Sequence, residues 1–110
     1  MFDDARMPQR PRRNRASQAR RDLVREAQLE ARHLVLPLFV QESEESVAIA
    51  SMPRHARLGI RGLVDKAREA WELGVRAVAL FPALGDELKD PYGRESLNPE
   101  GLLQRATRAL

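Results

Sequence analysis

The feature that most constrains the fold is a strand, a helix and a second strand that follow one another between residues 34 and 81. An apolar stretch rich in strand formers, LVLPLFV, covers residues 34–40. Residues 61–74, RGLVDKAREAWELG, carry apolar side chains at helical spacing. A second apolar stretch, VRAVALFP, follows directly at 75–82. This order predicts a right-handed βαβ unit with parallel strands, and therefore an α/β fold.

The rest of the chain leads into this unit or extends beyond it. Two parallel strands alone do not form a stable sheet, because a parallel sheet needs cover on both faces. We therefore expect residues 17–110 to be an incomplete α/β domain, preceded by an extended basic arm at residues 1–16. Residues 1–26 contain eight arginines and four acids, and arginine supplies nearly all the positive charge of the chain.

Capping signals predict one further helix on each side of the central unit. Ser17 is a suitable N-cap for a short helix that reaches about Gln28. Asn98, with Pro99 at the first helical position, predicts a second helix at the end of the chain. The apolar face of that second helix would comprise Leu102, Leu103, Ala106, Ala109 and Leu110.

Two glycines bound the central helix. Gly59 precedes it as a weak start signal, and Gly74 is expected to end it in a left-handed conformation. Residues 41–60 and 85–99 are expected to be long connections, the first with a small hairpin or an irregular cover formed by SVAIASMP. The central helix is expected to direct one apolar face into the core or an interface: Leu63, Val64, Ala67, Ala70 and Trp71.

Two lysines are the only side-chain amines, so they are the only candidates for a Schiff base. Lys66 lies near Asp65 and Glu69 on the polar side of the central helix, and Lys89 lies between two acids in the second connection. Acidic neighbours favour the charged, non-nucleophilic form of a lysine. We therefore expect both lysines to be surface residues, and we name no catalytic residue in this chain.

The chain offers little for a metal or cofactor site. It has no cysteine, and His33 and His55 are far apart, with no second histidine at ligand spacing. We expect a solvated loop rather than a cation site at the three acids of the first connection, Glu42, Glu44 and Glu45. No metal-binding or cofactor-binding residue is predicted.

Five stretches, in this order and spacing, resemble one family: porphobilinogen synthase, also called delta-aminolevulinic acid dehydratase. The resemblance covers about residues 10–110. This sequence departs from the family's usual pattern at Arg54, Gly59 and Leu97. The matching stretches are RPRRNR at 10–15, LVLPLFV at 34–40, SMPRHARL at 51–58, ELGVRAVALFP at 72–82 and ELKDPYGRESLNPEGLLQRATRAL at 87–110.

The resemblance implies a TIM (β/α)8 barrel, of which this chain would supply the N-terminal arm and the first two βα units. It implies an enzyme that condenses two molecules of 5-aminolevulinate into porphobilinogen in heme and tetrapyrrole biosynthesis. Its Schiff-base lysines and its zinc or magnesium ligands would lie beyond residue 110, so we expect no activity from this chain alone. Phe81, at the end of the second strand, is the one candidate in this chain for lining the catalytic cavity, and it would do so only as an apolar wall.

The resemblance also implies partners. In the family the arm wraps around a neighbouring subunit and helps to build a homo-octamer, a task that suits arginine because its planar fork pairs with carboxylates. A non-catalytic assembly module that docks on full-length subunits is one alternative. A small basic nucleic-acid-binding protein is another, less favoured because no aromatic residues interleave the arginines. We see neither a secretory signal nor an apolar run long enough for a membrane span, and we expect a cytoplasmic protein.

Overall fold

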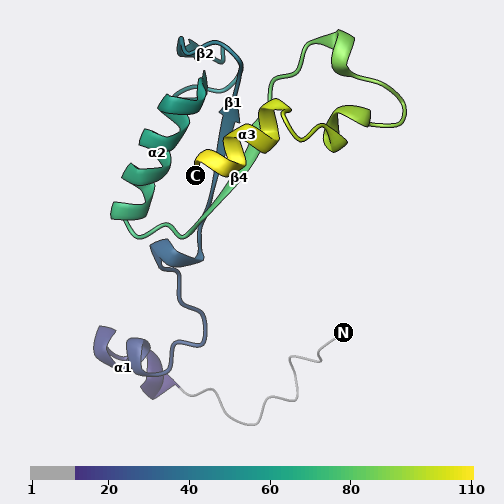
Figure 1. Cartoon of the computed structure of the whole chain (residues 1–110). Coiled ribbons are helices and arrows are strands. Elements are labelled where there is room, and N and C mark those ends of the chain that lie inside the picture. Colours follow the sequence, from purple (N-terminus) through teal and green to yellow (C-terminus); the bar gives the residue numbers. More distant parts are fainter. Residues whose placement is uncertain (1–11) are drawn as a thin grey trace.

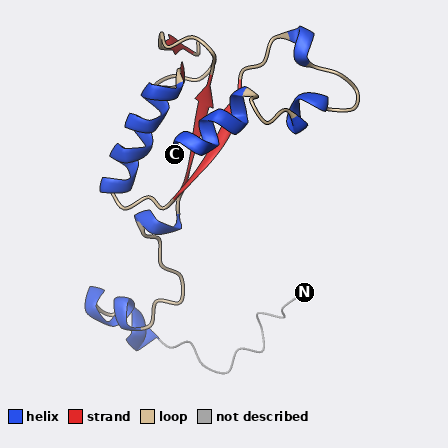
Figure 2. Cartoon of the chain, in the orientation of Figure 1, coloured by secondary structure: helices blue, strands red, loops and turns tan. Residues whose placement is uncertain are grey.

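The computed structural model describes residues 12–110, in which an α/β body follows a separate N-terminal part (Figure 1). The body contains a four-stranded sheet in the order β2-β3-β1-β4. The central strand β1 (Val35–Val40) is parallel to both β3 (Ala56–Leu58) and β4 (Ala77–Pro82). β2 (Val47–Ala48) forms a short antiparallel hairpin with β3. The helices α2 (Ile60–Glu72) and α3 (Leu102–Ala109) pack against each other and against the strands (Figure 2).

The predicted strand, helix and strand are confirmed. β1 and β4 pair in parallel along their whole length, from Val35 opposite Ala77 to Val40 opposite Pro82. Of the two alternatives for SVAIASMP, a hairpin is present, but its second strand, β3, lies beyond that stretch and was not predicted as a strand. Its three residues are too few to produce an alternating pattern, and they are held in the sheet by pairing with the last two residues of β1.

Gly74 ends the central helix as predicted. Its φ of 96° is left-handed, a conformation that glycine adopts without steric cost. The Gly74 N–H donates to the carbonyl of Trp71 at 3.0 Å, and the Val75 N–H donates to the carbonyl of Ala70 at 3.0 Å. This pair of bonds is a Schellman motif, which directs the chain from α2 into β4.

The start of α2 has an unusual cap. Gly59 is the N-cap and has no side chain to offer. A carboxylate oxygen of Glu44, from the first connection, instead accepts a hydrogen bond from the backbone N–H of Arg61 at 3.4 Å. An acid beside a helix N-terminus is also favoured by the helix dipole. The cap is thus supplied from a distant part of the sequence.

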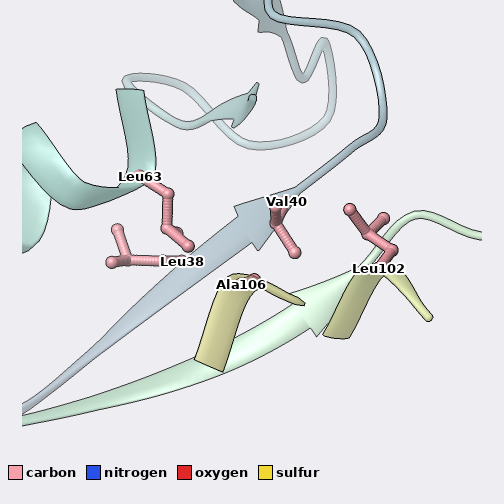
Figure 3. Packing of buried hydrophobic residues seen from close by; sticks show 5 residues of the cluster. All are labelled: Leu38, Val40, Leu63, Leu102 and Ala106. Atoms are coloured by element: carbon pink, nitrogen blue, oxygen red, sulfur yellow. The ribbon is translucent and has the colours of Figure 1, made fainter. Parts of the chain in front are cut away.

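The core lies between one face of the sheet and the two helices (Figure 3). Leu38 and Val40 point to this face from β1, where they meet Leu63 of α2. Leu102 and Ala106 of α3 complete the cluster. Residues of the opposite parity, including Val35 and Phe81, lie on the other face of the sheet, where both are at least half exposed. Within the described residues, the sheet is therefore covered on one face only.

Three predictions about the helices were wrong in detail. Ser17 caps α1 as expected, but α1 (Gln18–Leu23) ends well before Gln28, and its Leu23 has no partner to bury it. Residues 12–15 form a 3-10 turn rather than extended chain, and the remainder of the predicted arm, residues 1–11, lies outside the described residues. Asn98 was expected to cap the last helix. Its side chain instead accepts from the Glu100 N–H at 3.0 Å, which forms a turn before the helix begins.

Trp71 was expected on the apolar face of α2, in the core or an interface. The prediction of a core position is wrong. Its side chain is 59% exposed, and the guanidinium of Arg76 stacks on the ring at 4.1 Å from the ring centre. The buried side chains of α2 are Leu63 and Ala70, and Trp71, the residue after Ala70, points away from the core. No helix among residues 12–110 is both long and apolar enough to cross a membrane.

Candidate functional site

The carboxyl ends of β1 and β4 form the candidate site, because α/β proteins bind ligands beyond the carboxyl ends of their parallel strands. Phe39 and Phe81 face each other on these adjacent strands, and their rings stack with centres 5.4 Å apart. The ring of His55 lies 6.1 Å from that of Phe39. These three rings are here called the ring cluster, and the two phenylalanines supply its apolar surface. Phe81 lies where the sequence placed it, at the end of its strand, and is half exposed.

An ion pair holds the connection that leaves β1. Arg105 of α3 donates from Nη2 to both carboxylate oxygens of Glu42, at 2.5 and 2.6 Å. Its Nε donates to the carbonyl of Glu100 at 3.0 Å. The hydrogen bond to Glu42 raises the pKa of Arg105 above its ordinary value. Glu42 therefore fastens the loop at the end of β1 to α3.

The connection between β4 and α3 is polar, as predicted, and is shaped by local hydrogen bonds. Asp90 accepts from the N–H of Tyr92 at 2.7 Å, and Gly93 then takes a left-handed φ of 63°. Lys89 donates to Asp86 at 2.7 Å, and this bond lowers the pKa of the Asp86 carboxyl. Since this connection leaves the carboxyl end of β4, it lies beside the ring cluster's end of the sheet.

Both lysines lie at the surface. Lys66 donates to Glu69 at 2.7 Å and Lys89 to Asp86, each pair between exposed side chains three residues apart. Lys66 also lines a cavity of about 310 Å³ beside β1, together with Arg54 and His55. Its ammonium group is nevertheless bound to a carboxylate, which favours the charged form. Neither lysine has the desolvated surroundings that a Schiff-base amine needs.

Among residues 12–110 the candidate metal ligands are engaged elsewhere or lie apart. Within residues 12–110, histidine and acidic side chains form no group of three or more that could surround a metal ion. His33 instead accepts a hydrogen bond at Nδ1 from the N–H of Glu30, and Glu44 caps α2. Because the sequence has no cysteine, thiolate ligands are also excluded.

Sequence reasoning missed two parts of this site, the ring cluster as a unit and the Glu42–Arg105 pair. A signal for the first was present, since Phe39 and Phe81 are each the next-to-last residue of a parallel strand. Two parallel strands in register present such residues on the same face. No comparable signal exists for the ion pair, whose members lie 63 residues apart. Of the ring cluster, Phe39 and His55 line the cavity of about 310 Å³ beside β1.

Comparison with known proteins gives one consistent result. The family model of delta-aminolevulinic acid dehydratase matches residues 8–110. The chloroplastic delta-aminolevulinic acid dehydratase of Selaginella martensii is 47% identical over 106 residues, and that of Physcomitrium patens is 46% identical over 105 residues. These alignments cover 96% and 94% of this chain but only 25% and 24% of the relatives. The chain therefore spans about a quarter of the length of the curated relatives it matches.

A solved structure agrees with the sequence matches. The crystal structure of delta-aminolevulinic acid dehydratase (porphobilinogen synthase) from Toxoplasma gondii ME49, in complex with the reaction product porphobilinogen, superposes with a TM-score of 0.84. The two sequences are 46% identical. The superposition covers 96% of this chain and 30% of the Toxoplasma chain. The four-stranded α/β arrangement is thus similar to one part of that structure.

Proposed function

The chain belongs to the delta-aminolevulinic acid dehydratase family, and from this premise we propose that it is the N-terminal part of a porphobilinogen synthase. The proposed activity of the whole enzyme is the condensation of two 5-aminolevulinate molecules to porphobilinogen, a lyase reaction in heme and tetrapyrrole biosynthesis. The observation that carries the proposal is the family match over residues 8–110. The superposition on a product-bound family structure supports it.

In the proposed whole enzyme, β1 and β4 are the first two strands of a TIM barrel, with α2 and α3 in its outer ring. Three observations support this assignment. The two strands are parallel neighbours, both helices lie on one face of them, and the other face is apolar and uncovered. An uncovered face of this kind is what the interior of a barrel would fill.

The ring cluster would then face the barrel interior at the catalytic end of the strands. We assign Phe81 and Phe39 the role of an apolar wall of the substrate cavity, with the Glu42–Arg105 pair holding the loop above it. The Schiff-base lysines and the zinc or magnesium ligands would come from other parts of the enzyme, since Lys66 and Lys89 are paired surface residues. On this proposal the 110-residue chain alone has no activity.

A chimera tests the proposal directly. Residues 12–110 of this chain would replace the matching part of the Toxoplasma enzyme, and porphobilinogen formation would be assayed. We expect product from the chimera and none from the 110-residue chain. Chimeras carrying Lys66→Gln or Lys89→Gln should retain activity, while Phe81→Ala should raise KM for 5-aminolevulinate. A folded chimera of the correct oligomeric state that makes no product would overturn the proposal.

Trapping with borohydride in the presence of 5-aminolevulinate supplies a second readout. The intact mass of the 110-residue chain should stay unchanged, because neither lysine is placed to form a Schiff base. A reduced adduct at Lys66 or Lys89, together with product, would show that the lysine assignment is wrong.

An assembly module is the second candidate function, and the free edge of β4 is the observation that favours it. β4 is the outer strand of the sheet, so one row of its backbone groups lacks a strand partner among the described residues. Such an edge invites pairing with another chain. Co-purification of the chain with a full-length synthase subunit would support docking, whereas a monomer that ignores the enzyme would contradict it.

The basic arm is assigned to pairing with other subunits of a homo-octamer rather than to nucleic acid. Residues 1–16 hold five arginines against two acids. A salt-dependent shift of a random duplex, lost on removal of residues 1–16, would contradict this assignment. The proposed compartment is the cytoplasm. The plant relatives carry "chloroplastic" in their names, and a fluorescent fusion would distinguish the two locations.

A further inference from the structure

The cavity of about 310 Å³ beside β1 is bounded by β1, β3 and α2. β3 pairs with β1 only at Phe39 and Val40, so within the described part of the chain the preceding residues of β1 have no strand on this side. The volume is at the lower end of the range of about 300–1,000 Å³ that ligand pockets occupy. Most of the lining is apolar: Leu36, Pro37, Leu38, Phe39, Ala56 and Leu58.

The other side chains that line the cavity are all basic. Arg54 and His55 come from the turn before β3, and Lys66 comes from α2. Lys66 is already bound to Glu69 at 2.7 Å. Arg54 takes part in none of the ion pairs formed among residues 12–110. Arg54 is therefore the cation that remains for a ligand, and the cavity fits an anion with an apolar part.

Arg54 is held at the cavity in an unfavourable backbone conformation. Its φ of 69° is left-handed, and no other non-glycine residue among the described ones has a positive φ. A residue with a Cβ atom pays a steric cost in this conformation, which glycine avoids. Hydrogen bonds fix the turn, since the N–H groups of Met52 and His55 donate to the carbonyls of Ile49 and Met52 at 2.9 and 3.0 Å. Strain that the surroundings maintain in this way is concentrated at functional sites.

His55 adds a second donor whose position is fixed. Its ring lies 6.1 Å from the ring of Phe39, centre to centre, and the residue is partly buried. Its backbone carbonyl accepts from the Ile49 N–H at 3.0 Å, which ties it to the hairpin. An imidazole carries at least one N–H donor in either charge state. Two consecutive residues thus bring a guanidinium and an imidazole to one apolar cavity.

We propose that this cavity binds a short aliphatic carboxylate, with Arg54 as the ion-pair partner and His55 as a further hydrogen-bond donor. The aliphatic part packs on Leu36, Pro37 and Phe39. A guanidinium suits a carboxylate because its planar fork can donate two parallel hydrogen bonds. The carboxylate belongs either to a free small acid or to an acidic side chain from a neighbouring part of a larger protein, since both carry it on an aliphatic stem. The inference does not depend on the proposed enzymatic function.

Hexanoate is the probe, titrated into the 15N-labelled 110-residue chain and followed by amide chemical shifts. We expect saturable shifts concentrated at Leu36, Phe39 and His55. Pentylammonium, which has the same aliphatic tail and the opposite charge, should not produce them. High salt should weaken the binding of hexanoate, because it screens the ion pair. The absence of saturable shifts at these residues, or equal shifts with pentylammonium, overturns the proposal.

Arg54→Gly separates a binding role from a structural one. The variant loses the guanidinium, so the affinity for hexanoate should fall by about tenfold or more. It also relieves the left-handed backbone, so the midpoint of urea unfolding should rise. Arg57→Gln is the matched control, because it removes an exposed arginine of β3 that does not line the cavity, and it should leave the affinity unchanged. A lower midpoint with unchanged affinity would make Arg54 a structural residue and overturn the proposal.

The chimera with the Toxoplasma enzyme distinguishes the two sources of the carboxylate. If the chimera binds hexanoate and Arg54→Gly weakens the binding, the ligand is a free acid. If the chimera excludes hexanoate and Arg54→Gly lowers its melting temperature, an acidic side chain of the larger protein occupies the cavity. A chimera that neither binds hexanoate nor loses stability with Arg54→Gly overturns the proposal.

Discussion

A Cβ atom built on Gly59 would lie 2.5 Å from the Cα atom of Glu44, so these two residues touch backbone to backbone. The contact brings the first connection onto the start of α2, where the Glu44 carboxylate accepts the Arg61 N–H. Gly59 has an ordinary φ of −68°, so space rather than backbone conformation requires glycine here. Glycine is a weak N-cap residue by itself, but here it leaves the space that allows Glu44 to cap the helix instead.

Gly59→Ala should destabilise the body, because a backbone atom has to move. We expect a loss of about 1–3 kcal/mol in the free energy of unfolding, as for overpacking in a core. Gly62→Ala is the control, since its Cβ would meet only Leu58 side-chain atoms at 3.7 Å or more. That helical substitution should stabilise by about 0.5–1 kcal/mol. Urea unfolding followed by circular dichroism measures both, and equal effects would contradict the contact.

The Glu42–Arg105 pair should show positive coupling in a double-mutant cycle. Glu42→Gln, Arg105→Gln and the double variant would be compared by urea unfolding. The pair is partly exposed, with 36% of the Arg105 and 63% of the Glu42 side chain accessible, so the coupling should be small. It should shrink further in high salt. Additive single effects at low salt would mean that the pair does not hold the loop.

Asp86 should titrate below the ordinary aspartate pKa of 3.8, because Lys89 donates a hydrogen bond to it and stabilises its charged form. A lowered folded pKa contributes stability above the ordinary value, and this contribution is lost as the pH falls through the folded value. Side-chain NMR titration of Asp86 measures the shift. Lys89→Gln should return the pKa toward 3.8, whereas Lys66→Gln should not change it.

The uncovered sheet face should make the isolated body self-associate or bind an apolar dye. Phe81→Ser should reduce both effects, because it removes the half-exposed ring from that face. It should also cost about 0.5–1.5 kcal/mol from the lost stacking on Phe39. Analytical ultracentrifugation and dye fluorescence measure these changes, with Leu97→Ser as an exposed control outside the sheet. A wild-type chain that is monomeric, binds no dye and melts cooperatively would contradict the barrel assignment.

The sequence predicted those elements that are set by local patterns. The spacing of apolar residues predicted three elements, and one glycine predicted the helix end. All of them are present: β1, α2, β4 and the Gly74 cap. The surface position of the two lysines followed from their acidic neighbours. Elements that depend on partners elsewhere in the sequence were missed, including β3, which is defined by its pairing with β1 and β2, and the Glu44 cap. Trp71 was predicted to be buried because it has the spacing of the apolar face, but spacing does not show which part of that face contacts the sheet and α3.

The strand order has a consequence for synthesis of the chain. β1 is the first strand in sequence but lies between β3 and β4, both of which come later. As the polypeptide leaves the ribosome, β1 has no strand to pair with until residues 56–58 appear. Its full ladder has to wait for residues 77–82. About forty residues therefore follow β1 before its partner strand β4 has been made. At about 5–20 residues per second, β1 stays unpaired for several seconds, during which a chaperone could bind it.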